Sequence, residues 1–505
     1  MAVEFQHIPA NIRVPLFYAE VSNALAGSQQ INQPAMLIGP ITTTGAGAPA
    51  FDTPVFISDV AEAYSRFGIG SVLADMVAIY RQNDSYGELW AIPVDTPTGA
   101  AATGVITVAG TASSSGTLPL YIGGDLIRIA VAAGATAASV AAAIAAGITA
   151  SPFALVTAAN VPPAATVQLS AKQKGIIGNE IDLGVAYKGS GAGEVVPPGL
   201  TITFTPMTGG TGVIDVTAAF DAMGDDIYDY IGIASSDTAV LDDAGLAMND
   251  QTGRWAWDRQ VYGHVFTAKV DTASNLITFG HTRNDQHVTV MGVAPSPTPA
   301  WRHTAALTAQ AAIALRNDPA RPVHSLPLIG CMAPKRGTKF NRSTHNSLLY
   351  AGIAQETEVA GTVEISRCIT TYQKNVWGQP DPSYLDVETL ATIQYFIRFL
   401  RSRILQKFPR HKLADDGTVF GPGQAIVTPR IIRAELVAAY SEMMQLGIVE
   451  NIASFKALLI VERDQTDPNR VNVMASPDLI NQLRILALLV AFRLQTAPVP
   501  VALAA

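Results

Sequence analysis

The chain has 505 residues, a length that suits two to four domains with large cores. Its formal net charge is −8 and only 15% of its residues are charged, without the clustered basic face that nucleic-acid binding requires. So low a charged fraction fits a surface covered by other subunits, and it fits equally a large core beneath a Thr/Ser/Gly-rich surface.

The sequence shows no pattern typical of a signal peptide, a membrane span or a disulfide framework. The N-terminus has no basic region, and Pro9 and Pro15 interrupt any apolar run, so we expect no signal peptide. The uncharged stretch 129–147 is too weakly apolar to span a bilayer, and the apolar run near the end is too short. Two cysteines, Cys331 and Cys368, cannot form a disulfide framework, and we interpret them as buried thiols.

The first predicted element is a strand that lacks a hairpin partner. Residues 11–21 read NIRVPLFYAEV, a period-two pattern, and a small polar segment follows instead of a turn. Pro15 cannot donate a ladder hydrogen bond, so the strand belongs at a sheet edge. We therefore predict that residues 1–26 are an arm that pairs with another subunit through Ile12, Val14, Leu16 and Tyr18.

Residues 27–97 follow a β-α-β order. Residues 34–40 form an apolar run typical of a buried strand. A helix follows, with Ser58 as its expected N-cap and Gly68 as its stop, and then a second helix over 71–84. A strand over 87–94 completes the unit.

Composition changes after Pro97, and residues 98–205 are rich in Ala, Thr, Gly and Val. We predict a separate β-rich domain that is inserted into the first one and forms a peripheral unit on the outside of the molecule. Its strands are expected at 104–110, 117–131, 166–172 and 200–206, with one Ala-rich helix over about 137–146. Residues 111–117 are interpreted as a turn between the first two of these strands.

The α/β alternation resumes over 206–330. Apolar strand-like runs lie at 228–234, 260–268 and 287–293, separated by helical patterns, one of which has Asp237 as a plausible N-cap. A long helix is predicted over 300–317. Strands that alternate with helices indicate a parallel sheet covered on both faces.

Residues 331–483 are predicted to form an α+β C-terminal domain. One helix begins after Asp386 and has apolar residues at 3.6 spacing, and a second has Thr428 as its cap, Pro429 at its first position and Gly447 at its stop. Two strands are expected at 454–464 and 469–475. The segment 484–505 is predicted to be a second strand arm, with the apolar residues Leu486, Leu488, Val490 and Phe492.

No catalytic or ligand-binding motif stands out. The sequence lacks a dinucleotide-binding glycine motif, a phosphate loop and a nucleophile elbow. Asp225, Asp226 and Asp229 lack the spacing of a calcium loop, and we interpret them as solvated charge at a helix end. Trp255 and Trp257 would share one face of an extended strand, where core packing is favoured over ligand stacking. His264 is interpreted as a strand histidine. We therefore expect no cofactor, no metal and no catalytic residue.

The order of segments resembles that of contractile tail sheath proteins of Mu-like phages. Matching stretches cover most of the chain, whereas the inserted β domain is the least diagnostic part. The resemblance lies in residues 7–21, 60–84, 87–94, 363–373, 433–451 and 467–494, together with the helix that begins after Asp386.

The resemblance implies a fold, a function and a set of partners. The fold class is α/β and α+β multidomain, with a subtilisin-like α/β middle domain that lacks a matching catalytic triad. The implied function is a sheath subunit that polymerises around an inner tail tube and contracts without a nucleotide. The implied partners are other copies of the chain, the tube protein, and baseplate and tail terminator proteins, with no nucleic acid and no membrane insertion.

The family also implies where the subunit is found and which residues face the tube. The implied location is the virion tail, after assembly in the host cytoplasm. The C-terminal domain would lie innermost, with Arg398, Arg401, Arg403 and Lys407 facing an acidic tube; a solvated basic face is the alternative. A phage tube or baseplate protein, or an α/β hydrolase, remains as an alternative function.

Overall fold

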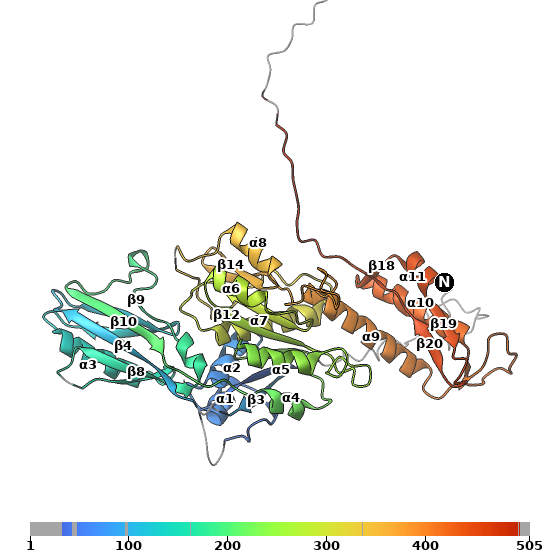
Figure 1. Ribbon diagram of the computed structural model, residues 1–505, viewed down its shortest axis with the longest axis horizontal. Helices are drawn as coiled ribbons and strands as arrows, with labels where there is room; N and C mark the ends of the chain where they lie inside the picture. The colour runs from blue at the N-terminus through green and yellow to red at the C-terminus, as the bar shows by residue number, and fades with distance from the viewer. Residues whose placement is uncertain are drawn as a thin grey trace, which may run out of the picture.

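The computed structural model describes residues 33–42, 48–95, 99–161, 163–335, 337–492 and 494. Three units lie in a row: a β-rich unit at one end, an α/β unit in the middle and an α+β unit at the other end (Figure 1). The C-terminal segment leaves this row and runs away from it. The mixed α/β and α+β fold class predicted from the sequence is confirmed.

The middle unit is built on an eight-stranded sheet with the order β15-β14-β13-β12-β11-β1-β3-β2. Pairing is parallel from β3 to β14, and the outermost strands β2 and β15 pair antiparallel. The strands are β1 (Ala35–Pro40), β2 (Val55–Phe56), β3 (Leu89–Val94), β11 (Tyr230–Ile233), β12 (His264–Val270), β13 (Val288–Val293), β14 (Ala354–Val359) and β15 (Thr362–Arg367).

Helices cover both faces of this sheet, as its apolar strands require. Two distinct clusters of buried side chains result: one contains Phe67, Met76 and Trp301, and the other contains Leu241 and Leu276. The expected two-sided parallel sheet is therefore confirmed. The helices are α1 (Val60–Phe67), α2 (Val72–Asn83), α4 (Thr217–Met223), α5 (Thr238–Met248), α6 (Ala273–Gly280), α7 (Ala300–Asn317) and α8 (Arg342–Tyr350).

Helix α1 begins one residue later than the sequence pattern predicted. Its N-cap is Asp59, whose carboxylate accepts the backbone N–H of Glu62 at 2.8 Å. Ser58, the predicted cap, instead donates its hydroxyl and backbone N–H to the Glu62 carboxylate, at 2.6 and 2.9 Å. The prediction of Ser58 was wrong because two adjacent residues can both serve as caps, and only the backbone path selects one.

Within its described residues, the inserted unit contains two antiparallel sheets, one α-helix and two short 3-10 helices. The sheet orders are β10-β4-β8-β7 and β6-β5-β9. The segment predicted as a turn, 111–117, connects β4 to β5, which belong to different sheets. The single strand predicted over 117–131 was wrong, because it is divided into β5 and β6. The hairpin forms between β5 and β6, at Gly123 and Gly124. The elements are β4 (Ala101–Gly110), β5 (Gly116–Ile122), β6 (Asp125–Val131), α3 (Ala137–Ala150), β7 (Val156–Ala159), β8 (Thr166–Lys174), β9 (Leu183–Val185) and β10 (Leu200–Thr208).

The insertion is fixed to the middle unit by a buried arginine. Arg302, near the start of α7, lies with its Nε 2.7 Å from the carboxylate of Asp75 on α2, and its Nη2 lies 2.8 Å from Asp125 of the insertion. The two ends of the insertion also meet, because the backbone N–H of Thr211 donates to the carbonyl of Ala100 at 3.2 Å. The unit therefore leaves and re-enters the α/β domain at one place.

The C-terminal unit packs three helices against short two-stranded sheets. The pairs are β16-β17, β18-β21 and β19-β20. Residues 454–458, predicted as strand, belong to helix α11 instead. The elements are α9 (Val387–Lys407), β16 (Lys412–Leu413), β17 (Ile426–Val427), α10 (Pro429–Gln445), β18 (Val449–Glu450), α11 (Ile452–Leu458), β19 (Ile460–Arg463), β20 (Val471–Met474) and β21 (Asp478–Leu479).

The sequence-predicted boundary between residues 330 and 331 was wrong. Strands β14 and β15 lie beyond it, yet they complete the middle sheet, with β14 paired in parallel to β13. The middle unit therefore continues through β15, and the C-terminal unit begins near α9.

Candidate assembly surfaces

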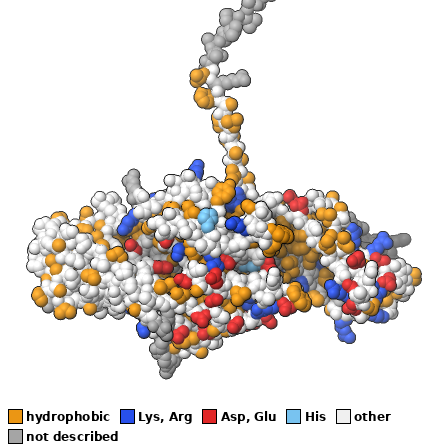
Figure 2. Space-filling model, in the orientation of Figure 1, with side chains coloured by type: hydrophobic (Ala, Val, Ile, Leu, Met, Phe, Trp, Pro, Cys, Tyr) orange, Lys and Arg blue, Asp and Glu red, His pale blue; other side chains and the backbone are white. Residues whose placement is uncertain are grey.

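The C-terminal arm predicted from the sequence projects from the body with its apolar side chains in solvent (Figures 1 and 2). Residues 480–492 form no helix or strand in the single chain. Exposure of Leu486, Leu488, Val490 and Phe492 ranges from 69% to 85%. A run of large apolar side chains held in water is unfavourable and marks a surface for another molecule.

The corresponding residues of the first arm cannot be compared with the structure. Ile12, Val14, Leu16 and Tyr18 lie outside the described residues, and their pairing stays a prediction.

An open sheet lies in the C-terminal unit. Among the residues that the structure describes, strands β19 and β20 pair only with each other, and β19 packs against α10. Their side chains Ile460, Val473 and Met474 are about half exposed. A two-stranded sheet is marginally stable alone, and each open edge presents unpaired backbone groups. This sheet is suited to accept a strand from another chain.

Arg398 does not lie on an open basic face. Its Nη1 is 2.8 Å from the Asp229 carboxylate, and the two side chains are only 8% and 2% exposed. Its Nη2 also donates to the carbonyl of Val261 at 3.2 Å. Burial raises the pKa of Asp229, and Arg398 opposes that rise. Arg398 therefore joins α9 to the middle sheet. Its assignment to a tube-facing surface is corrected, as is the interpretation of Asp229 as solvated.

The other predicted tube-facing residues differ in their partners. Arg403 forms ion pairs with Glu435 at 2.6 Å and with Glu442 at 2.8 Å, and Lys407 also pairs with Glu435. Arg401 is exposed and has no ion pair within the described part of the chain. The acidic residues of α10 thus neutralise much of the basic charge at the end of α9.

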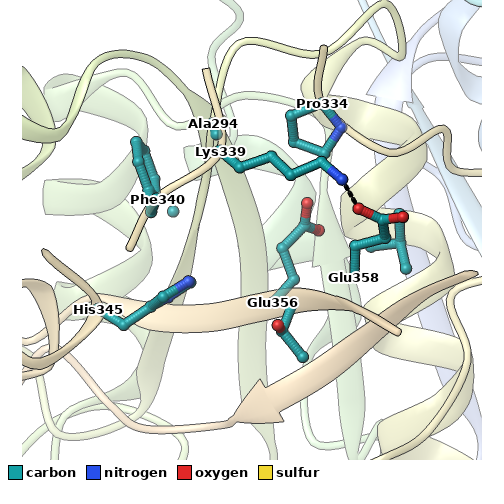
Figure 3. Close-up of a pocket in the computed structure, with 10 residues that line it drawn as sticks. Ala294, Pro334, Lys339, Phe340, His345, Glu356 and Glu358 are labelled. Carbon is teal, nitrogen blue, oxygen red and sulfur yellow. Dashed lines mark ion pairs between the residues drawn. The ribbon is translucent and has the colours of Figure 1, made fainter. Parts of the chain in front are cut away.

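A pocket of about 160 Å³ lies beside the carboxyl ends of β13 and β14 (Figure 3). Lys339 and Glu358 form an ion pair in its wall, and Phe340 and His345 line it. Glu356 also lines the pocket, and its carboxylate is 2.8 Å from the imidazole of His303. Burial disfavours the imidazolium, but Cys331 and Glu356 outweigh this and raise the pKa of His303 well above its usual range.

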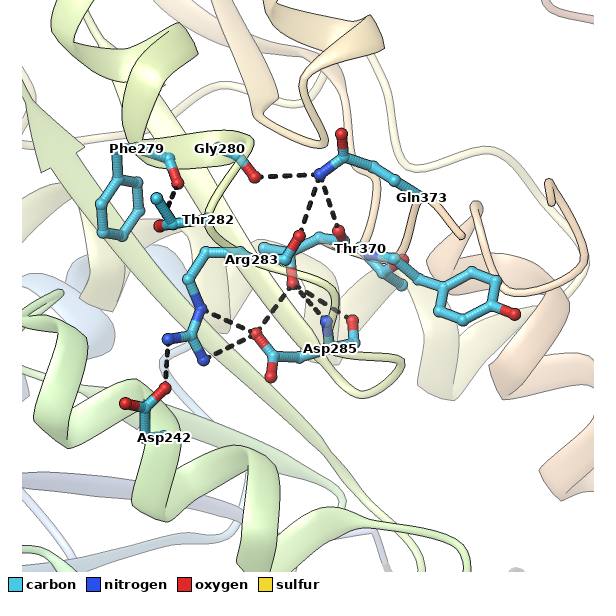
Figure 4. A network of polar contacts seen from close by, with 10 residues as sticks. Asp242, Phe279, Gly280, Thr282, Arg283, Asp285, Thr370 and Gln373 are labelled. Carbon is cyan, nitrogen blue, oxygen red and sulfur yellow. Dashed lines mark hydrogen bonds and ion pairs between the residues drawn. The ribbon is translucent and has the colours of Figure 1, made fainter. Parts of the chain in front are cut away.

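A second polar cluster ties the connection after α6 to the segment that follows β15 (Figure 4). Arg283 pairs with Asp242 at 2.5 Å and with Asp285 at 2.8 Å. The amide of Gln373 donates to the carbonyls of Gly280 and Arg283 at 2.9 and 3.0 Å. These contacts hold backbone segments together and form a structural network.

The structure tests three predictions about individual side chains. Trp255 and Trp257 do not share a strand: Trp255 stacks on His287 with 4.1 Å between ring centroids, whereas Trp257 is exposed. His264 lies on β12, as predicted, and is buried. Of the two cysteines, Cys368 is buried and Cys331 is partly exposed.

Neither a metal centre nor a membrane span is evident within the described ranges. No group of three or more His, Cys, Asp or Glu side chains there could hold a metal ion. None of the helices described combines the length and apolar character that crossing a bilayer requires.

A multidomain body with an exposed apolar arm and an open sheet has the features of a self-assembling structural protein. The model of the phage tail sheath protein central domain matches residues 209–371, and that of the phage tail sheath C-terminal domain matches residues 379–493. The Mu-like prophage FluMu tail sheath protein of Haemophilus influenzae is 39% identical over 494 residues, which covers 96% of this chain and 99% of that protein. The chain therefore belongs to the phage tail sheath family, as a structural subunit of a contractile tail sheath.

Solved structures were also found to be similar. The sheath tail protein of Desulfitobacterium hafniense has a TM-score of 0.46 at 11% identity, with 93% of this chain and 100% of that chain covered. The sheath tail protein Lin1278 of Listeria innocua has a TM-score of 0.44 at 11% identity, with 89% and 95% covered. A chain of the anti-feeding prophage baseplate has a TM-score of 0.46 at 10% identity, with 96% and 100% covered.

Proposed function

We propose that the chain polymerises with copies of itself into a helical cylinder around an inner tail tube, and that contraction of this cylinder drives the tube through the host envelope during DNA delivery. The observation that carries this proposal is the C-terminal arm, which exposes a continuous apolar run that has no partner among the described residues of its own chain. Strand addition to another subunit would bury this run and satisfy its backbone groups.

The acceptor that we propose is the β19–β20 sheet of a neighbouring subunit. No other described strand pairs with its outer edges, which therefore offer backbone hydrogen bonds, and its half-exposed Ile460 and Val473 offer an apolar face. A third strand would convert a marginal two-stranded sheet into a stable one. The N-terminal arm, residues 1–26, would contribute a further strand through Ile12, Val14, Leu16 and Tyr18.

Side-chain burial decides whether such pairing is stable. Six backbone hydrogen bonds contribute roughly 3–9 kcal/mol, and ordering a segment of about ten residues costs on the order of 10 kcal/mol or more. Burying four large apolar side chains adds roughly 6–12 kcal/mol at most. The balance is narrow, so polar replacements in the arm are expected to prevent assembly.

The remaining partners follow from the same proposal. The subunit would contact the tube protein, the baseplate and the tail terminator, without binding nucleic acid or inserting into a membrane. Exposed basic residues near the end of α9, with Arg401 foremost, would face the tube. Energy for contraction would be stored during assembly, with no nucleotide and no catalysis. Assembly in the host cytoplasm would place the protein in the virion tail.

The test is to remove the arm and to follow polymerisation. A chain that ends after Arg484 should stay folded but should not form cylinders in negative-stain micrographs, because the apolar run is lost. Replacement of both Leu488 and Val490 by Asn should have the same effect. A matched control is Leu246→Asn, which changes an exposed leucine on α5 and should leave assembly unchanged. Cylinders of normal length from the shortened chain would contradict the proposal.

A further inference from the structure

The root of the C-terminal arm is held by one arginine. After β21, the backbone N–H of Ile480 donates to the carbonyl of Ile448 at 3.2 Å, and the chain then forms no further helix or strand through Phe492. Arg484 interrupts this exposed stretch, since its side chain is only 14% exposed. Its Nη2 lies 2.9 Å from Glu388 and 3.2 Å from Asp386. The apolar residues that follow, 485–492, are exposed instead.

The two acceptors of Arg484 belong to a rigid site at the start of α9. Glu388 is fully buried, and its second carboxylate oxygen accepts the backbone N–H of Val323 at 2.6 Å. Asp386 also pairs with Arg367, at the end of β15, at 3.2 Å. Acidic side chains are favoured at a helix N-terminus. The site thus combines the first turn of α9 with the last strand of the middle sheet.

Because of this attachment, the arm leaves the body at the junction between two units and not from the C-terminal unit alone. The chain comes from the C-terminal unit, where β21 pairs with β18, but Arg484 binds at the junction with the middle unit. The exposed run from Ile485 onward therefore begins at that junction, and in Figure 1 the segment turns away from the body there. Without this contact, the free tether would begin near Ile480, several residues earlier.

We propose that Arg484 is a positioning residue that fixes the point and the direction from which the C-terminal arm leaves the subunit. The inference rests on the proposed function, in which the arm is donated to a neighbour. A shorter and directed tether raises the effective concentration of the arm at its acceptor. A charge-assisted bond to a buried carboxylate is suited to this role because it is both strong and geometrically defined.

The direct test measures the arm in the single, unassembled chain. Spin labels at Ala487→Cys on the arm and Ser274→Cys on α6, in a Cys331→Ser background, report the distribution of distances between arm and body. The informative variant is Arg484→Met with Glu388→Gln, which removes both charges and leaves no buried carboxylate unpaired. We expect the width of the distribution to increase at least about twofold, with an unchanged melting temperature.

The conservative variant Arg484→Lys keeps a cation at the site and should retain a narrow distribution. On assembly, the double variant should polymerise about tenfold more slowly than the unchanged protein, and Arg484→Lys should stay within about threefold. A narrow distribution of spin-label distances in the double variant would refute the proposal that Arg484 positions the arm. This readout does not depend on polymers, so it stands apart from the arm-deletion test: cylinders from the shortened chain would refute strand donation, whereas only the distance measurement decides the anchor.

Discussion

At the scale of single residues, the ion pair between Arg398 and Asp229 shows what a sequence leaves open about charge. The spacing of the basic residues on α9 follows directly from the sequence, but the acidic residues that pair with them lie far away along the chain. Asp229 directly precedes β11, and Glu435 and Glu442 lie on α10. A basic helix face can therefore be solvated, bound to another protein or neutralised internally, and the sequence pattern is the same in all three cases.

The buried ion pair between Arg398 and Asp229 predicts that Arg398 contributes far more than Arg401 to the free energy of unfolding. Arg398→Met leaves the Asp229 carboxylate buried without its counter-charge, and we expect a loss of about 3–5 kcal/mol in the free energy of unfolding. Adding Asp229→Asn should recover most of this loss. Arg401→Gln is the matched control, with an expected change below about 0.5 kcal/mol. Chemical denaturation of the chain that ends after Arg484 measures all of these, and a loss below about 1 kcal/mol for Arg398→Met would contradict the prediction.

Glu180 predicts a dependence of stability on pH. Its carboxyl group is buried beside the first turn of α7, where it accepts a hydrogen bond from Ala300, and burial raises its pKa to about 7. Between about pH 4.5 and 7 the folded state then binds a proton that the unfolded state has released, so stability falls as pH rises through this window. Glu180→Gln should flatten this slope and add on the order of 1–3 kcal/mol above pH 7. Denaturation midpoints at pH 5 and pH 8 provide the measurement. An equal change in stability between these two pH values in the unchanged protein and in Glu180→Gln would refute the prediction.

At the scale of elements, most helices and strands of the middle unit were predictable because they carry strong local signals. Asp237 caps α5 and Thr428 caps α10, as expected from their positions before apolar runs. The strand predicted over 454–464 was wrong for residues 454–458, because a short apolar stretch fits a strand or a helix equally well. Asn451 adopts a left-handed conformation and caps α11, which a sequence pattern does not reveal. The anchor at Arg484 was missed for a related reason, since its acceptors lie about a hundred residues earlier in the chain.

The C-terminal arm illustrates an element that one chain cannot complete. Its continuous run of apolar residues favours a strand, yet residues 480–492 form none in the single subunit. A strand needs a neighbouring strand for its backbone hydrogen bonds, so local propensity alone does not suffice. The sequence therefore indicated the arm and its apolar residues, whereas the strand itself stays a prediction about the polymer.

At the scale of the whole molecule, the order of units was predictable and their attachment was not. A change in composition marked the insertion, and the visible face of that unit carries few charged side chains compared with the rest of the body (Figure 2). The boundary after residue 330 failed because β14 and β15 lack a compositional signal and are recruited to the sheet by tertiary pairing. The buried contacts of Arg302 also lay beyond sequence patterns, since they join three separate segments.

The insertion supplies the last prediction, which concerns assembly without it. Because Ala100 and Thr211 are hydrogen-bonded neighbours, a short Gly/Ser turn can replace residues 101–210 without moving either end. Arg302 keeps Asp75 but loses Asp125, and Tyr64 loses its ring contact with Phe153. We therefore expect the melting temperature to fall by about 5–10 °C. Cylinders should still form, with an unchanged inner diameter where they surround the tube. The substitution Asp125→Asn in the complete chain separates the lost ion pair from the lost packing, and it should lower the melting temperature by less. If the shortened protein is folded by circular dichroism but forms no cylinders in micrographs, the insertion contributes a contact between subunits, and its role as a peripheral unit is refuted.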